Sequence, residues 1–168
     1  MSERAVPESV VAGRSGPDAV LVVVTANVIA EAVTTIAGAV GLPLVVLHHD
    51  DSDEPVADRL TGLDLTDRHA VVLTDHDAPG TAEVLRAALA GPAGYVGMMG
   101  SRRRAEGLFA TLREEGVPED ALARLHVPVG LDVGGRSPGE MALSVVAEVS
   151  AWASGKLVRD GDRSRLTG

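Results

Sequence analysis

The chain contains no cysteine and very few aromatic residues. Its 168 residues include one Tyr, one Phe and one Trp, although 45% of them are hydrophobic. The absence of thiols excludes cysteine nucleophiles, disulfides and thiolate metal sites, and it is compatible with a reducing compartment. The core must therefore be aliphatic, built from Val, Leu, Ile and Ala. The length suits a single domain with a sizeable core.

Basic residues and long apolar runs are also scarce. The chain carries 15 basic and 24 acidic residues, which gives a formal net charge of −9. A nucleic-acid surface requires a basic face, so we expect no nucleic-acid partner. No run is long and apolar enough to span a membrane, and residues 1–17 lack the apolar core of a signal peptide. We expect a cytoplasmic protein, with 1–17 as a flexible arm and 154–168 as a disordered tail.

Between these ends, residues 18–153 alternate between short apolar runs and helical patterns. The expected strands are 19–24, 43–47, 70–73, 95–99 and 125–129, and the main expected helices are 28–40, 81–90, 102–115 and 138–153. Continuous apolar strands are typical of a parallel sheet that is buried on both faces. The pattern predicts a single-domain α/β fold, Rossmann-like and doubly wound, with helices on both faces of a mostly parallel sheet. Ligand sites lie beyond the carboxyl ends of such strands, so Thr25, Thr74 and Ser101 are expected at one sheet edge.

The first expected strand-to-helix turn lacks the glycines of a dinucleotide site. Such a site has the pattern G-x-G-x-x-G, whereas this turn reads Thr25-Ala26-Asn27. Side chains at these positions crowd a pyrophosphate, and His48-His49 stands where an acidic ribose partner is expected. We therefore expect no ordinary NAD or NADP binding. Adjacent histidines at the end of a strand point to opposite sides, so we predict no metal site there.

The most distinctive segment is Gly100-Ser101-Arg102-Arg103-Arg104. The apolar helical pattern that follows it consists of Ala105, Leu108, Phe109 and Leu112. Ser101 is therefore the expected N-cap, and the arginines form the first turn. A cation at this end is unfavourable by about 0.3–1 kcal/mol, because the helix N-terminus is already positive. We interpret the segment as a site for a phosphate or another anion. The alternative is that the arginines face outward and pair with acidic neighbours such as Glu106.

Two further loops follow expected strands. Thr74-Asp75-His76-Asp77 places two carboxylates beside a histidine, an arrangement that can hold the histidine in one tautomer for proton transfer. An Asx-type turn that caps the next helix through Asp77 or Thr81 accounts for the residues equally well.

The glycine-rich loop Gly130–Gly135 also has two interpretations. Its N–H groups could bind an anion or a pterin ring, or its glycines could simply permit a turn with positive φ. His126 and Asp132 flank the first glycine and are functional candidates, although a structural histidine is the commoner outcome.

Three motifs together resemble the C-terminal Rossmann-like domain of the XdhC/CoxI family. They are Tyr95-Val-Gly-Met-Met-Gly-Ser-Arg-Arg-Arg104, Leu125-His-Val-Pro-Val-Gly-Leu-Asp-Val-Gly134 and Ser137-Pro-Gly-Glu-Met-Ala-Leu-Ser-Val-Val-Ala-Glu148. The likeness covers residues 19–153. It departs from the family at the first turn, which is usually G-A-G-H. The family's N-terminal domain, with its cysteine-containing motif, has no counterpart here, so we expect a stand-alone Rossmann part.

The resemblance implies an accessory role in the maturation of molybdenum hydroxylases such as xanthine dehydrogenase or carbon monoxide dehydrogenase. Family members bind the molybdenum cofactor, molybdopterin, and deliver it to the apoenzyme. A hydroxylase apoenzyme or a cofactor-sulfurating enzyme is then the expected partner, and a homodimer is open. The expected cofactor-binding residues are Thr74, Asp75, His76, Asp77, Gly100, Ser101, Arg102, Arg103, Arg104, Gly130 and Asp132.

We expect a cofactor-binding and transfer protein rather than an enzyme, and we assign no catalytic residue. Two alternatives stay open. One is a nucleotide-dependent oxidoreductase, which a glycine-rich first turn would have favoured. The other is a regulatory or interaction module that retains only the fold.

Overall fold

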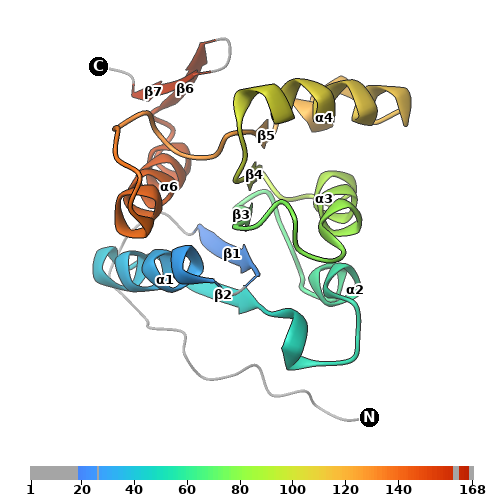
Figure 1. Ribbon diagram of the computed structural model, residues 1–168, viewed down its shortest axis with the longest axis horizontal. Coiled ribbons are helices and arrows are strands. Elements are labelled where there is room, and N and C mark those ends of the chain that lie inside the picture. Colours follow the sequence, from blue (N-terminus) through green and yellow to red (C-terminus); the bar gives the residue numbers. More distant parts are fainter. Residues whose placement is uncertain (1–18, 26, 161–162, 167–168) are drawn as a thin grey trace.

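Five parallel strands form the central sheet of the computed structural model, which describes residues 19–25, 27–160 and 163–166 (Figure 1). They are β1 (Val20–Val24), β2 (Leu44–Leu47), β3 (His69–Leu73), β4 (Tyr95–Met98) and β5 (Leu125–His126), in the order β2-β1-β3-β4-β5. The strand order reverses between β1 and β3, which makes the sheet doubly wound with a switch point between these two strands. The predicted α/β fold is confirmed, whereas the expected arm 1–17 lies outside the described residues.

Helices cover both faces of this sheet. The elements that connect or follow the strands are α1 (Val28–Val40), the 3-10 turn η1 (His49–Asp51), α2 (Val56–Thr61), α3 (Thr81–Ala90), α4 (Arg102–Glu114), α5 (Glu119–Leu122) and α6 (Pro138–Ala153). The helices α1 and α6 lie side by side on one face, while α2, α3, α4 and α5 cover the other (Figure 1). Along β1, Leu21 and Val23 face the α1–α6 layer and Val22 and Val24 face the opposite layer. Within the described ranges, no helix has the length and apolar character needed to cross a bilayer.

The helix ends follow the capping residues that the sequence supplies. Asn27 caps α1, which ends at Gly41 with a φ of 74°. Ser101 Oγ accepts the Arg104 N–H at the start of α4. Ser137 and Glu140 form a reciprocal capping box at α6, with Pro138 as the first helical residue. Hydrogen bonds from the Ser137 backbone and hydroxyl and from the Arg136 backbone hold the pKa of Glu140 below its ordinary value.

Two segments differ from expectation. β5 contains only Leu125 and His126 rather than 125–129, and Pro128 has no N–H to continue a ladder; the strand lies at the sheet edge, where such a proline is tolerated. Within the segment expected to be a disordered tail, β6 (Leu157–Asp160) pairs antiparallel with β7 (Arg163–Leu166). The expectation of disorder is wrong for these two strands. The charged residues of this segment led to the expectation of disorder, although Asp160-Gly161 is a dipeptide typical of hairpin turns.

Close packing at the start of β4 depends on a glycine. A Cβ at Gly94 would overlap the backbone oxygen of Asp67 and lie 2.7 Å from Trp152 Cζ2. The backbone oxygen belongs to the segment that leads into β3, so it cannot swing aside as a flexible side chain would. By contrast, a Cβ at Gly107 in α4 would meet nothing within 4 Å.

We predict that Gly94→Ala lowers the free energy of unfolding by about 1–3 kcal/mol, the usual cost of overpacking. Urea denaturation measures this change. The control Gly107→Ala should raise the same quantity by about 0.5–1 kcal/mol, because alanine is the better helix former. A Gly94→Ala variant as stable as the parent protein would contradict the packing argument.

Candidate functional site

Polar residues collect where β1, β3 and β4 end. The last residues of these parallel strands are in register, with Val24 beside Leu73 and Leu73 beside Met98. The segments that begin at Thr25, Thr74 and Met99 therefore leave the sheet at the same edge, which lies at the switch point. The predicted common edge for Thr25, Thr74 and Ser101 is confirmed.

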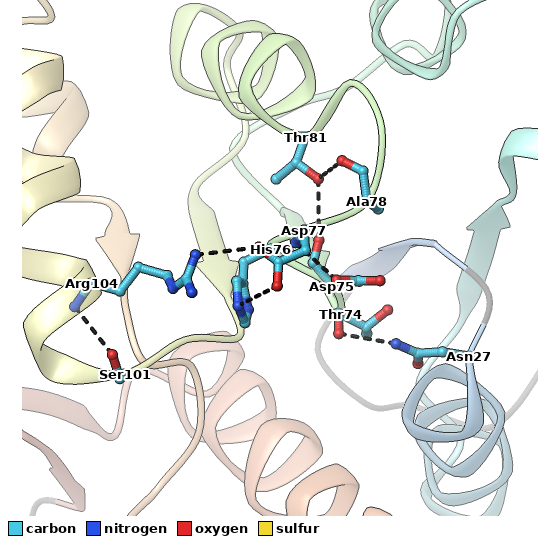
Figure 2. A network of polar contacts seen from close by, with 9 residues as sticks. All are labelled: Asn27, Thr74, Asp75, His76, Asp77, Ala78, Thr81, Ser101 and Arg104. Atoms are coloured by element: carbon cyan, nitrogen blue, oxygen red, sulfur yellow. Dashed lines mark hydrogen bonds and ion pairs between the residues drawn. The ribbon is translucent and has the colours of Figure 1, made fainter.

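Thr74 joins the ends of β1 and β3. Its buried hydroxyl lies 3.0 Å from Val24 O and 2.9 Å from Thr25 O, and it donates to these carbonyls. Asn27 Nδ2 donates to Thr74 O at 3.1 Å (Figure 2). Asn27 Oδ1 accepts the Ala30 N–H at 2.9 Å. The first turn is thus held against the end of β3 by side chains rather than left open.

Thr25 occupies a backbone conformation that favours glycine. Its φ is 80°, and it is the one non-glycine residue with positive φ in the described part of the chain. A β-branched residue is unfavourable in this left-handed region, because its Cβ crowds the following carbonyl. The Thr25 side chain is buried, and its Oγ1 lies 3.5 Å from His49 Nε2. The backbone at Thr25 therefore has a conformation typical of glycine, and the threonine side chain fills space that a glycine would leave empty.

The arginine-led start of α4 lies exposed at this edge. Ser101 and the three arginines that follow it are all exposed. The inward side of the helix carries Ala105 and Leu112, which are buried as the apolar pattern predicts. Gly100 precedes the cap, and a Cβ there would have ordinary room, with the nearest atom, Val127 Cγ1, at 3.5 Å.

Asp77 is a carboxylate that reaches this helix start from the β3–α3 loop. Its Oδ1 lies 3.3 Å from Arg104 Nη1, and its Oδ2 lies 3.1 Å from His76 Nε2 (Figure 2). The side chains of Arg104 and Asp77 are 50% and 73% exposed, so solvent screens their attraction. The interpretation that the arginines pair with acidic residues thus holds for Arg104, but the partner comes from the β3–α3 loop.

The β3–α3 loop is an Asx turn built on its first aspartate. Asp75 Oδ1 accepts the Asp77 N–H at 2.9 Å, and Thr81 Oγ1 donates to Ala78 O at 2.7 Å. The N-cap of α3 is Gly80, with a φ of 76°, so the expected cap through Asp77 or Thr81 is wrong. A glycine can adopt this conformation at no steric cost and frees both side chains for other contacts.

This loop also brings three potential metal ligands together. Asp75, His76 and Asp77 each offer one ligand atom, and these atoms lie within 4.8 Å of one another. Asp77 already contacts both His76 and Arg104, and the guanidinium would repel a cation. We assign no metal to this cluster.

The glycine-rich loop packs on α6 through its first two residues. Gly130 has a φ of 109°, and a Cβ there would lie 3.2 Å from Ser144 Cβ. The Leu131 N–H donates to Ser144 O at 3.2 Å. Asp132 is exposed beyond this contact. The positive φ of Gly130 thus serves the approach to α6, which supports the structural interpretation of that glycine.

Two residues acquire roles that the sequence did not reveal. Asn27 both caps α1 and closes the switch point, and Asp77 supplies the counter-ion of Arg104. The position of Asn27 immediately before a helical pattern was a readable capping signal. Nothing local to Asp77 pointed to Arg104, which lies 27 residues away in sequence.

We predict that Thr25→Gly is more stable than Thr25→Ala by about 1 kcal/mol, the low end of the cost of a left-handed residue. Both variants lose the threonine hydroxyl and methyl groups, so the difference between them reports the strain of a Cβ at positive φ, net of the greater unfolded-state entropy of glycine. Chemical denaturation of the two variants side by side measures it. An alanine variant at least as stable as the glycine variant would show that Thr25 is not strained.

Comparisons with known proteins agree with the motifs. The family model described as the XdhC Rossmann domain matches residues 21–149. The uncharacterized protein YqeB of Escherichia coli (strain K12) is 45% identical over 58 residues, which are 34% of this chain and 11% of YqeB. The crystal structure of a xanthine dehydrogenase (BH1974) from Bacillus halodurans superposes with a TM-score of 0.68 at 25% identity.

The superposition with the Bacillus halodurans protein covers 83% of this chain and 44% of the other. The chain therefore spans less than half the length of both relatives. Because the family model spans most of the chain, including all five strands of the sheet, the chain belongs to the XdhC family through its Rossmann domain.

Proposed function

We propose that this chain is an accessory protein in the maturation of a molybdenum hydroxylase of the xanthine dehydrogenase or carbon monoxide dehydrogenase type. In this role it binds the molybdenum cofactor, or a related phosphate-bearing ligand, and passes it to the apoenzyme. The observation that carries the proposal is the arginine-led helix start at the switch-point edge of an XdhC-family Rossmann domain.

The start of α4 has the chemistry that a phosphate requires. The first amides of a helix have no intrahelical partner, and the helix dipole adds partial positive charge at this end. Arg102, Arg103 and Arg104 add three cations to the same place, and all three side chains reach solvent. In the proposed complex, these side chains and the backbone around Gly100 and Ser101 hold the phosphate.

The residues at this edge fit a single phosphate better than the pyrophosphate of a dinucleotide. A pyrophosphate needs close backbone approach at the first turn, where Thr25 has a buried side chain and Asn27 is bonded to Thr74 O. The phosphate of molybdopterin needs only the α4 site. His76 and Asp132 lie on loops of the same edge and are proposed to contact the pterin or the partner enzyme. NAD and NADP are not part of the proposal.

The class of partner is inferred from the exposure of this edge. An exposed binding edge, rather than an enclosed one, suits a ligand that must be handed to a second protein. A hydroxylase apoenzyme, or an enzyme that sulfurates the cofactor, is the proposed recipient or donor. The Bacillus halodurans neighbour is described as a xanthine dehydrogenase, which supports this class of partner.

We predict that replacing all three arginines, Arg102→Gln, Arg103→Gln and Arg104→Gln, weakens binding of inorganic phosphate and molybdopterin but does not destabilise the free protein. Each lost cation relieves the helix N-terminus by at most about 1 kcal/mol. Loss of the exposed Arg104–Asp77 pair offsets this by about 0–1 kcal/mol. Isothermal titration and urea unfolding measure the two effects.

Arg113→Gln is the matched control, because it removes a cation from the far end of the same helix, where Arg113 pairs with Glu119. This control should leave the titration unchanged. If the triple variant is less stable but binds phosphate and molybdopterin as the parent protein does, the arginines have a structural role. The anion site would then no longer support cofactor binding.

We further predict that Asp77→Asn tightens phosphate binding by about five-fold, since a like charge beside the anion is removed at a gain of about 1 kcal/mol. Phosphate titration at constant ionic strength measures the gain. Asp120→Asn removes one negative charge from an exposed position on another element, α5, and should have no effect. Equal tightening by both variants would attribute the effect to net charge instead.

A further inference from the structure

A polar cluster lies buried between the sheet and α6, away from the anion edge. Glu148 of α6 is fully buried. Tyr95 Oη in β4 donates to Glu148 Oε1 at 2.6 Å, and His126 Nδ1 in β5 lies 3.3 Å from the same oxygen. The Tyr95 and His126 rings stack at 4.3 Å between centroids. A carboxylate at such a position is retained only with partners that compensate its burial.

The absence of a side chain at Gly97 makes room for this stack. Gly97 is the β4 residue paired with His126 in the sheet. A Cβ there would lie 3.0 Å from Tyr95 Cε1 and 3.1 Å from Val129 Cβ. The histidine ring is therefore enclosed by the tyrosine ring, the carboxylate and the sheet.

The oxygen that faces His126 must be an acceptor. A separation of 2.6 Å is typical of a hydroxyl that donates to an ionised carboxylate. If Nδ1 carried no proton, its lone pair would face the lone pairs of Glu148 Oε1 at 3.3 Å in an apolar enclosure. This contact would be repulsive. Nδ1 and Glu148 Oε2 are also the two buried side-chain polar atoms without an aligned hydrogen-bond partner among the described residues. A proton on Nδ1 turns the close contact with Oε1 from repulsion into attraction.

We propose that Glu148, supported by Tyr95, fixes His126 as the Nδ1–H tautomer, so that Nε2 is presented as an unprotonated acceptor at the β5 edge. The His126 side chain keeps 10% of its surface exposed, and β5 is the outermost strand of the sheet. In this tautomer, the lone pair of Nε2 can accept a hydrogen bond from an N–H or O–H donor. Glu148 and Tyr95 act as positioning residues. This assignment does not depend on the anion site.

The other histidines provide internal references of the opposite kind. His48 Nδ1 accepts the Asp50 N–H and His69 Nδ1 accepts the Thr66 N–H, each at 3.0 Å. An Nδ1 that accepts a hydrogen bond carries no proton, so these two rings are Nε2–H when neutral. The contrast with His126 can be read in one spectrum.

The test is a long-range proton–nitrogen NMR correlation on the 15N-labelled protein at about pH 8.5, two units above the ordinary histidine pKa. A His126→Gln variant assigns the His126 signals by their loss. The expected result is a protonated Nδ1 and an unprotonated Nε2 for His126, with the reverse for His48 and His69. An Nε2–H ring at His126, or a ring protonated on both nitrogens at this pH, would overturn the assignment.

Two variants separate positioning from packing. Glu148→Met removes the acceptor at similar volume and should shift His126 toward the Nε2–H form, whereas Glu148→Gln keeps an acceptor oxygen and should retain Nδ1–H. Amide spectra confirm that each variant is folded. If Glu148→Met folds and His126 remains Nδ1–H, Glu148 is not the positioning residue. The spectrum of the unmodified protein decides the tautomer even if neither variant folds.

Discussion

The requirement to cover a parallel sheet that is apolar on both faces governs the arrangement of the rest of the molecule. Leu21, Val22 and Val23 of β1 have no exposed surface, and they alternate between the two helical layers. Parallel neighbours cannot be joined by tight turns, so each connection crosses a face as a helix or loop. One consequence is that strand ends, rather than strand faces, are where polar side chains meet solvent and one another.

The sequence predicted those features that depend on local patterns. Val and Leu runs located the strands, and Ser101 marked a helix start that the structure has at the same position. The expectation of a parallel sheet let Thr25 and Thr74 be placed together, because parallel strands share one carboxyl edge. Features that depend on contacts between segments distant in sequence could not be predicted. The contact of Asp77 with Arg104, the positive φ of Thr25 and the enclosure of Glu148 each depend on segments distant in sequence.

The two polar clusters of this domain differ in how firmly they are held. Arg104 and Asp77 meet in solvent, where their attraction is weak and either side chain can turn to another partner. Tyr95, His126 and Glu148 meet in the core, where the low dielectric strengthens each satisfied contact and penalises each broken one. The exposed cluster is therefore suited to exchange of partners, and the buried one to fixing the orientation of a single ring.

The three arginines at the start of α4 stand on a chain whose formal net charge is −9. Salt screens charges over about 8 Å at physiological ionic strength, so the field of the arginines is short-ranged. An approaching anion first meets the repulsion of the whole molecule and is attracted only near the helix itself. Encounter rates for anions should consequently rise with added salt while residence times fall, the reverse of the rate pattern at a site that steers its ligand from a distance. In the proposed role, this edge would select anions by contact, after diffusion has brought them close.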